Sequence, residues 1–349
     1  MYLVTGGAGF IGSAVVRALL RAGASVINVD ALTYAADEQF VAPSSRDPRH
    51  HFERADVRDA SRLRELFDRF RPRAVLHLAA ESHVDRSIDA PADFITTNVV
   101  GTFTLLEEAR RYWTSLPADD AAQFRFVHVS TDEVFGSLGE VGQFTEATPY
   151  APRSPYAASK AASDHLARAW HHTYGLPVIV ANASNNYGPF QFPEKLISLA
   201  TINAILEQPI NVYGDGTNVR DWTFVDDHAA ALVAIADRGR VGETYLVGAG
   251  EQRRNIDVVE SICALVDALL PNVTEPRHRL IRFVQDRPGH DVRYAVDASK
   301  AKRELGWEPS ESFDSGLRRT VAWYVANRDW WQRLRARYSG LRLGSGAHE

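Results

Sequence analysis

A glycine-rich turn near the start of the chain constrains its fold more than any other feature of the sequence. The turn, Gly6–Gly12, separates a short apolar run, Tyr2–Thr5, from an amphipathic helical pattern at 11–22, and its glycines fit both G-x-G-x-x-G and G-x-x-G-x-x-G. Glycines at these positions allow a tight turn and let backbone N–H groups approach a pyrophosphate where the helix begins. The turn therefore predicts a strand–turn–helix unit that binds a dinucleotide.

The second apolar run, residues 25–30, ends in an aspartate 18 positions after Gly12. A carboxylate at the end of a second strand can accept hydrogen bonds from the adenosine ribose hydroxyls, and it repels a 2′-phosphate. Asp30 therefore favours NAD over NADP as the cofactor. Asp56 and Val57, at the end of the third apolar run, are expected beside the adenine.

Short apolar runs alternate with longer amphipathic patterns through the first half of the chain. The expected strands are 2–5, 25–30, 51–56, 74–79, 124–130 and 178–183, and the expected helices are 11–22, 61–70, 92–112 and 155–174. This alternation predicts an α/β fold with right-handed crossovers and a doubly wound parallel sheet. Ligands of such sheets bind at the carboxyl ends of the strands.

After Tyr187 the pattern loosens into loops that carry glycine and proline. Residues 222–247 fit a helix followed by a strand, and we expect them to return to the sheet. A helix is expected over 255–270, with Asp257 and Glu260 spaced as a capping box, and a tryptophan-rich helix over 317–334. The predicted domains are an NAD-binding domain at 1–187 with 222–247, a smaller substrate-binding domain at 188–221 and 248–339, and a frayed tail at 340–349.

Composition excludes several classes of function. With 39 Lys and Arg against 44 Asp and Glu, the formal net charge is -5, so no basic field is available for a nucleic-acid backbone. No apolar run approaches the roughly 18–20 residues of a membrane span, and the first residues lack a signal-peptide pattern. The single cysteine, Cys263, lies in an apolar stretch and suits a core residue in a reducing compartment. We therefore expect a cytoplasmic protein without a nucleic-acid partner, a membrane partner or a metal.

A tyrosine and a lysine four residues apart, Tyr156 and Lys160, fall within the expected helix at 155–174. This spacing puts both side chains on one helical face. A phenol with a pKa near 10 must lose roughly three units to act as a base at neutral pH, which is about 4 kcal/mol. A nearby ammonium and a bound cationic nicotinamide could together supply this difference. A functional role for this pair is better supported because Ser130 and Thr131 precede it, at the end of the fifth expected strand.

The glycine turn and the Tyr156-x-x-x-Lys160 pair resemble the extended short-chain dehydrogenase/reductase family. Within it, Thr131-Asp132-Glu133 resembles the catalytic triplet of the dTDP-glucose 4,6-dehydratases. Further matching blocks lie at 79–87, 184–189, 192–196, 219–222 and 286–291. The chain departs from the family pattern at Phe135, where Tyr is usual, at Ala31, where Lys is common, and in its short first strand. The resemblance implies an extended Rossmann fold with a smaller C-terminal substrate domain.

The resemblance also implies a reaction, the conversion of dTDP-glucose to dTDP-4-keto-6-deoxyglucose and water. Tyr156 would take the C4 hydroxyl proton while hydride passes to NAD, and the hydride would later return to C6, so that NAD is recycled. Glu133 would abstract the C5 proton, and Asp132, held protonated, would protonate the departing C6 hydroxyl. Such a division needs environments that separate the two pKa values. Because neighbours in a strand point to opposite faces, the strand must end before Asp132.

The catalytic set that the resemblance implies is Thr131, Asp132, Glu133, Tyr156 and Lys160. The implied NAD-binding residues are Gly6, Gly9, Phe10, Ile11, Gly12, Asp30, Ala31, Leu32, Thr33, Asp56, Val57, Leu78, Ala79, Ala80, Ser82, Thr97, Tyr156, Lys160 and Asn186. The implied substrate-binding residues are Ser82, Thr131, Asp132, Glu133, Asn185, Lys195, Leu196, Asn211, Val212, Tyr213, Arg220, Asn255, Asp286, Arg287 and His290.

Among the substrate residues, Arg220 and Arg287 suit bidentate contacts to phosphate oxygens, and Lys195 suits a point charge. His83, Asp85 and Arg86 are expected to organise the loop after the fourth strand.

Three other functions stay open: an NAD-dependent dehydratase of UDP-sugars, a 4-epimerase, and a regulatory protein that binds NAD as a redox sensor. The pair Asp132 and Glu133 argues against an epimerase, which needs neither a C5 base nor a C6 acid. The catalytic set argues against a sensor without activity, whereas thymine as the nucleobase depends on the resemblance alone. The helices at 92–112 and 155–174 are long, and in the resembled family their equivalents form a four-helix bundle between subunits, so a homodimer is expected.

Overall fold

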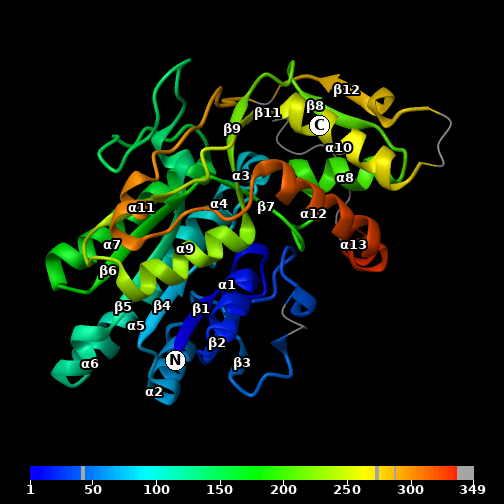
Figure 1. The fold of residues 1–349 in the computed structure, drawn as a ribbon. Coiled ribbons are helices and arrows are strands. Elements are labelled where there is room, and N and C mark those ends of the chain that lie inside the picture. Colours follow the sequence, from blue (N-terminus) through cyan, green and yellow to red (C-terminus); the bar gives the residue numbers. More distant parts are fainter. Residues whose placement is uncertain (41–43, 272–274, 287, 336–349) are drawn as a thin grey trace.

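The computed structural model describes residues 1–40, 44–271, 275–286 and 288–335 (Figure 1). Arg287 and the predicted frayed tail at 340–349 therefore lie outside the described residues. None of the described helices combines the length and the apolar character that a membrane span requires.

A seven-stranded parallel sheet with the strand order β10-β6-β5-β4-β1-β2-β3 forms the centre of the molecule. Its strands are β1 Tyr2–Thr5, β2 Val26–Asp30, β3 His50–Arg54, β4 Ala74–His77, β5 Arg125–Thr131, β6 Val178–Ala183 and β10 Thr244–Val247. β1, β2, β4 and β6 are buried along their whole length, because helices cover both faces of the sheet. The predicted doubly wound α/β fold is confirmed, and the chain reverses its direction of winding between β1 and β4.

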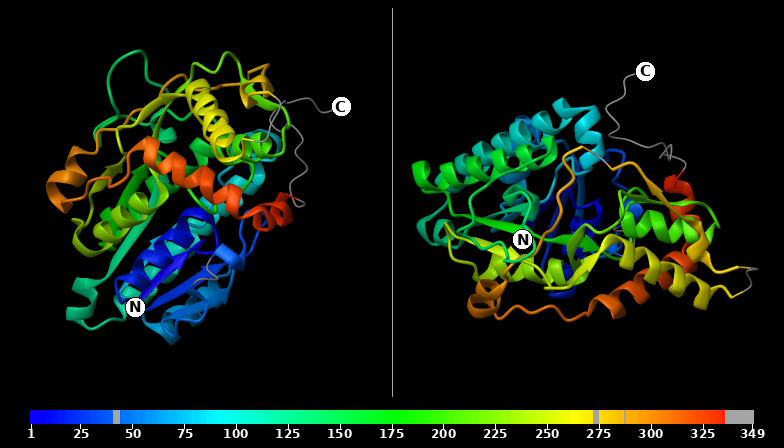
Figure 2. Two further views of the ribbon diagram at one scale, coloured as in Figure 1. Left: turned by 45° about the vertical axis from the view of Figure 1, so that its right-hand side comes forward. Right: turned by 90° about the horizontal axis from the view of Figure 1, so that it is seen from above.

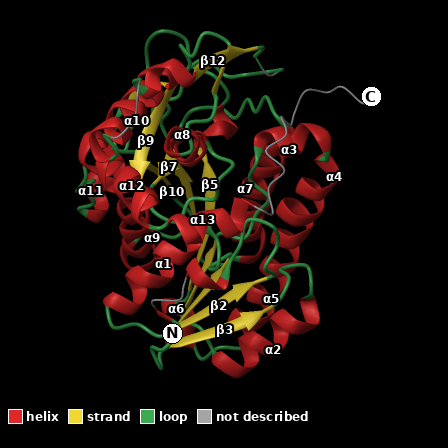
Figure 3. Cartoon of the chain, turned by 90° about the vertical axis from the view of Figure 1, so that its right-hand side faces the viewer, coloured by secondary structure: helices red, strands yellow, loops and turns green. Residues whose placement is uncertain are grey.

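Two helical layers enclose the sheet (Figure 3). α1 (Phe10–Arg21) and α9 (Val225–Arg238) pack together on one face, and their apolar residues join one core. α2 (Ala60–Phe70), α5 (Thr102–Thr114) and α7 (Pro155–Tyr174) cover the other face around a second core. The other helices beside the sheet are α3 Val84–Asp89, α6 Ala118–Gln123 and α11 Ser299–Leu305.

Most of the segment 222–247 lies with the central sheet, whereas its first three residues belong to a strand of the smaller part. It starts at the end of β9 (Val219–Phe224), continues through α9 and ends in β10, which pairs in parallel with β6. Consequently β9 itself belongs to the smaller part of the molecule, while the helix and strand that follow it belong to the large sheet.

The smaller part has its own sheets and its own core (Figure 2). One sheet has the order β11-β9-β7, with β7 Asn185–Tyr187 and β11 Gln252–Arg254, and another pairs β8 Ile210–Tyr213 with β12 Ile281–Val284. Its helical elements are α8 Leu196–Ile205, α10 Asn255–Leu269, η5 Arg277–Leu280, α12 Phe313–Ala326 and α13 Arg328–Arg335. Cys263 is buried in this core, as expected.

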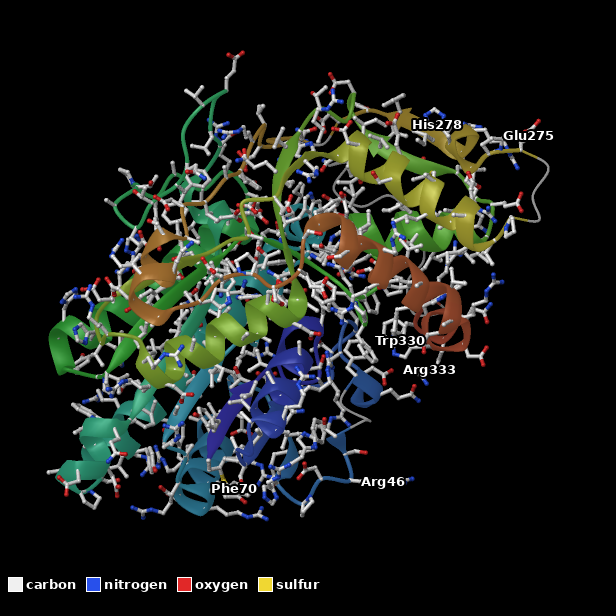
Figure 4. All side chains as sticks on the ribbon, viewed as in Figure 1. Arg46, Phe70, Glu275, His278, Trp330 and Arg333 are labelled. Atoms are coloured by element: carbon white, nitrogen blue, oxygen red, sulfur yellow. The ribbon has the colours of Figure 1, made fainter. Side chains whose placement is uncertain are left out.

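The loop after β2 connects the two parts. Its short 3-10 helix η1 (Glu38–Phe40) buries Phe40 against Trp330 of α13, with ring centroids 5.3 Å apart. Figure 4 shows Trp330 and Arg333 on the side of α13 that faces this loop, where an Arg333 Nη donates to an Asp37 Oδ at 3.4 Å. A segment that follows a strand of the large sheet therefore packs in the core of the smaller part.

Three predicted helices differ from the structure. The expected helix at 92–112 is a continuous stretch of α4 (Pro91–Phe94), a π-helical segment (Ile95–Gly101) and α5. The expected helix at 317–334 is broken at Asn327, whose backbone leaves the helical region and whose side chain donates to the Trp323 carbonyl at 2.8 Å. α10 has no capping box, because Asp257 instead binds the guanidinium of Arg254 at 2.6 and 2.8 Å.

Candidate active site

A cavity of about 650 Å³ lies at the carboxyl ends of the central strands and extends to the smaller part of the molecule. Its place next to β1 and β4 agrees with the rule that doubly wound sheets bind ligands where the strand order reverses. The described members of the predicted NAD set all line this cavity except Leu32. The described members of the predicted substrate set all line it except Asp286.

The glycine turn is too close to its neighbours for side chains. A Cβ added at Gly12 would lie 2.0 Å from the carbonyl oxygen of Gly6, and one added at Gly6 would lie 2.8 Å from the amide nitrogen of Ala79. Gly6 also has a φ of +71°, which favours glycine. α1 starts within this segment, at Phe10, so the N–H groups of its first turn lie at the cavity.

Asp30 connects the glycine turn to the loop after β2. Its Oδ2 accepts from the Ala8 N–H at 2.9 Å, and its Oδ1 accepts from the Leu32 N–H at 2.8 Å. Burial raises the pKa of Asp30, and these two hydrogen bonds oppose the rise. Leu32 reaches this position with a φ of 55°, so its contribution is to hold Asp30 rather than to line the cavity.

The residues around the glycine turn fit a bound NAD. The turn leaves no room for side chains where a pyrophosphate would lie, and the Asp30 carboxylate keeps lone pairs that can accept from ribose hydroxyls. Ala36 and Ala55 add apolar walls at the carboxyl ends of the outer strands, and Asp56 is held by three N–H groups of Arg58.

Tyr156 and Lys160 lie in the first half of α7, whose start is capped by Ser154. Tyr156 hydrogen-bonds with the Thr131 side chain, and burial together with Glu133 raises the pKa of its phenol. The Lys160 ammonium donates to the Val129 carbonyl of β5 at 2.8 Å, and burial lowers its pKa to about 8. The ammonium is thus directed at the strand, and the expected lowering of the phenol pKa is not present in the protein alone.

A buried carboxylate one helical turn beyond Lys160 was not anticipated from the sequence. Asp164 is fully buried, and it accepts hydrogen bonds from His128 at 3.0 Å, Ser130 at 2.9 Å, Tyr150 at 2.7 Å and Asn182 at 3.1 Å. Burial would raise its pKa, but His128, Lys160 and these hydrogen bonds hold the pKa below its usual value. Asp164 is therefore an anion that raises the pKa of Lys160. The i, i+4 spacing from Lys160 was the available signal.

The strand that carries the acid pair ends before Asp132, as predicted from the sequence. β5 ends at Thr131, and a 3-10 turn, η4 (Asp132–Phe135), begins directly after it. Asp132 is 1% exposed, whereas Glu133 is only partly buried. Burial, with a further contribution from Glu133, raises the pKa of Asp132 well above its usual value. The surroundings of Asp132 thus favour its protonated form, next to a more accessible carboxyl group.

Lys195 and Arg220, the described lysine and arginine of the substrate set, are both engaged by neighbours. The Lys195 ammonium donates to the Ser82 carbonyl at 2.8 Å. Arg220 is 5% exposed, and its terminal nitrogens donate to the carbonyls of Val219 at 2.8 Å and Asp291 at 2.9 Å. Arg220 also lines the cavity, where its positive charge lowers the pKa of Asp132, and its contact with phosphate oxygens stays a prediction.

The rim of the substrate side is formed by two side-chain pairs. Asp286 lies outside the cavity lining, but its Oδ1 binds His290 Nδ1 at 2.7 Å, and His290 does line the cavity. The Tyr213 hydroxyl donates to Asp85 at 3.1 Å. These contacts fix the orientation of Tyr213, at the end of β8, and of His290, in the loop after β12.

A second group that the sequence argument missed centres on Glu194. Its carboxylate accepts from the Tyr34 hydroxyl at 3.2 Å and from Arg86 Nε at 3.4 Å, and Arg86 also stacks on the Tyr34 ring at 3.8 Å. Burial raises the pKa of Glu194. The group joins the loop after β2 to the start of α8. As expected, His83 organises the loop after β4, since its ring accepts from the Arg86 N–H.

Comparisons with known proteins give consistent matches. The chain matches the family model described as GDP-mannose 4,6 dehydratase over residues 3–320. It is 57% identical to the dTDP-glucose 4,6-dehydratase of Neisseria meningitidis serogroup B, over 99% of each chain, and 54% identical to that of Escherichia coli, over 98% of each. A double mutant of the Streptomyces venezuelae dTDP-glucose 4,6-dehydratase, solved with NAD bound, superimposes with a TM-score of 0.88 at 45% identity, covering 96% of this chain and 99% of that one.

Proposed function

The chain belongs to the dTDP-glucose 4,6-dehydratases within the GDP-mannose 4,6 dehydratase family, and from this premise we propose how its residues divide the work. The reaction is the NAD-dependent conversion of dTDP-glucose to dTDP-4-keto-6-deoxyglucose and water. The enzyme is therefore a hydro-lyase, and the resemblance seen in the sequence is confirmed.

Oxidation at C4 comes first because it acidifies the C5 proton. Tyr156 takes the C4 hydroxyl proton, and Lys160, buried against β5, carries the positive charge on the same helical face. The glycine turn and Asp30 would hold NAD, which would supply the hydride-transfer chemistry needed at C4 and C6. The raised pKa of the Tyr156 phenol in the protein alone means that the phenol stays neutral until a cationic ligand is bound beside it.

Elimination across C5 and C6 then uses the acid pair. Glu133, the more exposed carboxyl group, abstracts the C5 proton, and Asp132, buried and protonated, donates to the C6 hydroxyl as it leaves as water. The observation that carries this assignment is the 3-10 turn η4, which lets two adjacent carboxyl groups serve one sugar. A 4-epimerase has no step that would use either group.

The substrate diphosphate is proposed to bind between the sheet and the smaller part of the molecule. Lys195, Arg220 and His290 line that side of the cavity and bring positive charge or N–H donors to it. The proposed roles of these three residues are supported by their side-chain chemistry and by their position in the cavity. The sequence blocks that contain them also resemble the family.

Mass spectrometry of the reaction mixture tests the function. Incubation with dTDP-glucose should yield a product lighter by one water, without added NADH, and UDP-glucose should react more slowly. Continuous growth of NADH absorbance without loss of water would reveal a net dehydrogenase and contradict the proposal. Faster turnover of UDP-glucose would move the assignment to a UDP-sugar dehydratase.

We further propose that the enzyme is a cytoplasmic homodimer. Ile95, Val100 and Phe103 are 45–48% exposed on the stretch that leads into α5, and Tyr174 at the end of α7 is 46% exposed. α5 and α7 run side by side on the outside of the molecule (Figure 2). The ring of Phe103 in α5 packs against that of Trp170 in α7, with ring centroids 5.7 Å apart. A second copy would cover this apolar face. Sedimentation should give about twice the chain mass of 38.8 kDa, and a monomer at micromolar concentration would contradict the proposal.

A further inference from the structure

The proposed reaction leaves a proton imbalance within the enzyme after every turnover. Tyr156 has gained the C4 hydroxyl proton, and Asp132 has lost one proton to the departing water. Glu133 removes the C5 proton and returns it when the hydride arrives at C6, so its own balance is zero. Before the next turnover, one proton must leave Tyr156 and one must reach Asp132. This inference rests on the proposed function.

Asp132 has little access to an outside proton donor. It is 1% exposed, and its Oδ2 has no hydrogen-bond partner within the described part of the chain. Its Oδ1 accepts one hydrogen bond, from the Thr131 hydroxyl at 3.3 Å. The Thr131 hydroxyl is therefore a protein group placed to return a proton to Asp132.

The Thr131 hydroxyl lies between the residue with the surplus proton and the residue that lacks one. Besides donating to Asp132, it accepts from the Glu133 N–H at 3.2 Å and shares a hydrogen bond with the Tyr156 phenol. A hydroxyl has one donor hydrogen and two acceptor lone pairs. With neutral Tyr156 donating to it, both lone pairs of Thr131 are used, and its hydrogen is directed at Asp132.

The backbone fixes this arrangement. Thr131 is the last residue of β5, where it pairs with Ala183 of β6, and it caps the 3-10 turn that carries both carboxyl groups. Thr131 is 9% exposed, so its side chain is held among these partners. The relay atoms belong to one strand end and one helix, so substrate binding need not bring them together.

We propose that the Thr131 hydroxyl is a proton relay that resets the enzyme, passing the proton gained by Tyr156 to Asp132 after each turnover. The hydroxyl gives its hydrogen to the Asp132 carboxylate and receives the phenol hydrogen from Tyr156. The phenolate and the protonated Asp132 that begin the next turnover are thereby restored, and the hydrogen bonds reverse direction. One negative charge moves from Asp132 to Tyr156, so no charge has to leave the buried site.

The test compares the first turnover with later turnovers in Thr131→Val and Thr131→Ser. Valine keeps the β-branched shape that suits a strand but has no hydroxyl, whereas serine keeps the hydroxyl. With enzyme in excess, dTDP-glucose reports a turnover that needs no reset; with substrate in excess, every later turnover needs one. We expect the later turnovers of Thr131→Val to be at least about tenfold slower than its first, with no such gap in Thr131→Ser.

A merely structural role would slow the first and later turnovers of Thr131→Val equally, and that result would overturn the relay. dTDP-6-fluoro-6-deoxyglucose gives a second check, because fluoride leaves without a proton from Asp132 and the relay has nothing to return. On this substrate, the deficit of Thr131→Val relative to the unmodified enzyme should be the same in first and later turnovers. If the deficit of Thr131→Val also grew in later turnovers on the fluorinated substrate, the proposed relay would be overturned. Failure of the unmodified enzyme to eliminate water would instead reject the proposed function.

Discussion

The two halves of the cavity are built by different means. On the cofactor side, buried parallel strands end at the cavity, and the glycine turn is fitted so closely that a Cβ at Gly12 would lie 2.0 Å from a backbone oxygen. On the substrate side, the strands are short and the predicted substrate residues come from short strands, helix starts and loops. Lys195 is held by the Ser82 carbonyl and His290 by Asp286. The cofactor half should therefore be sensitive to added atoms, and the substrate half to removed side chains.

The acid pair at the junction of the halves should give the largest effect. Each of Asp132→Asn and Glu133→Gln should lower kcat on dTDP-glucose by about 10²–10⁴-fold, because each removes one proton-transfer group. Glu133→Gln should still oxidise C4 and form transient NADH while losing C5 proton exchange. Tyr156→Phe should fail earlier, with no NADH formed. Stopped-flow absorbance and product assays measure these rates.

The fluorinated substrate separates the two carboxyl variants. Fluoride at C6 leaves without protonation, so it should rescue Asp132→Asn but not Glu133→Gln. Equal rescue of both, or of neither, would contradict the division of roles between Asp132 and Glu133.

A Gly12→Ala substitution should break the cofactor side alone. The added Cβ meets backbone atoms that cannot rotate away, and overpacking of this kind costs about 1–3 kcal/mol, or about 5- to 150-fold in affinity. NAD titration should show this loss, while dTDP affinity stays within about twofold. Gly139→Ala is the control, since nothing lies within 4 Å of its added Cβ. Equal weakening of both ligands would mean that the halves are not independent.

Lys195→Met should give the converse result. It removes a cation from the substrate side but retains the apolar stem, so dTDP affinity should fall about tenfold, the value of a charge-assisted hydrogen bond, with NAD affinity unchanged. Lys302→Met, which removes an exposed lysine paired with Glu308 on the surface, should change neither affinity. Isothermal titration with dTDP and NAD separates these outcomes, and an unchanged dTDP affinity would remove Lys195 from the site.

Asp164→Asn should give the smallest effect, visible as a shift in pH dependence. The Lys160 ammonium has a pKa of about 8, so activity that depends on the ammonium is lost as pH rises through that value. Removing the Asp164 charge, with His128 and Arg168 left in place, should lower this pKa by about one unit and reduce kcat about threefold at pH 7.5. Asp119→Asn, exposed on α6, is the control. An unshifted alkaline limb would show that Asp164 does not set the charge of Lys160.

Sequence reasoning predicted the cofactor half better than the substrate half. The apolar runs at Tyr2–Thr5 and Val178–Ala183 are strands that are buried on both faces. The glycine residues of the turn indicated its close backbone contacts, because only glycine fits there. Residue identity therefore specified the structure in these places. The π-helical turn at Ile95–Gly101 and the break at Asn327 carry no comparable sequence signal, since they depend on tertiary packing and on one local backbone angle.

The partners of charged side chains were the hardest features to predict. Arg220 is predicted from the sequence as a phosphate ligand and does line the cavity, but its hydrogen bond to the distant Asp291 carbonyl could not be foreseen. Asp164 and Glu194 bind groups from several elements that only the fold brings together. Ion pairs of this kind depend on long-range topology, whereas the turn of Thr131, Asp132 and Glu133 depends on where one strand ends.

The fate of the C4 hydrogen tests the central claim most directly. dTDP-glucose carrying deuterium at C4 should give a product that has lost one water and kept the deuterium, now located at C6 by NMR, with no NADH accumulating. An internal hydride return requires this outcome at every turnover. Loss of the deuterium to solvent, or its accumulation in released NADH, would contradict the account.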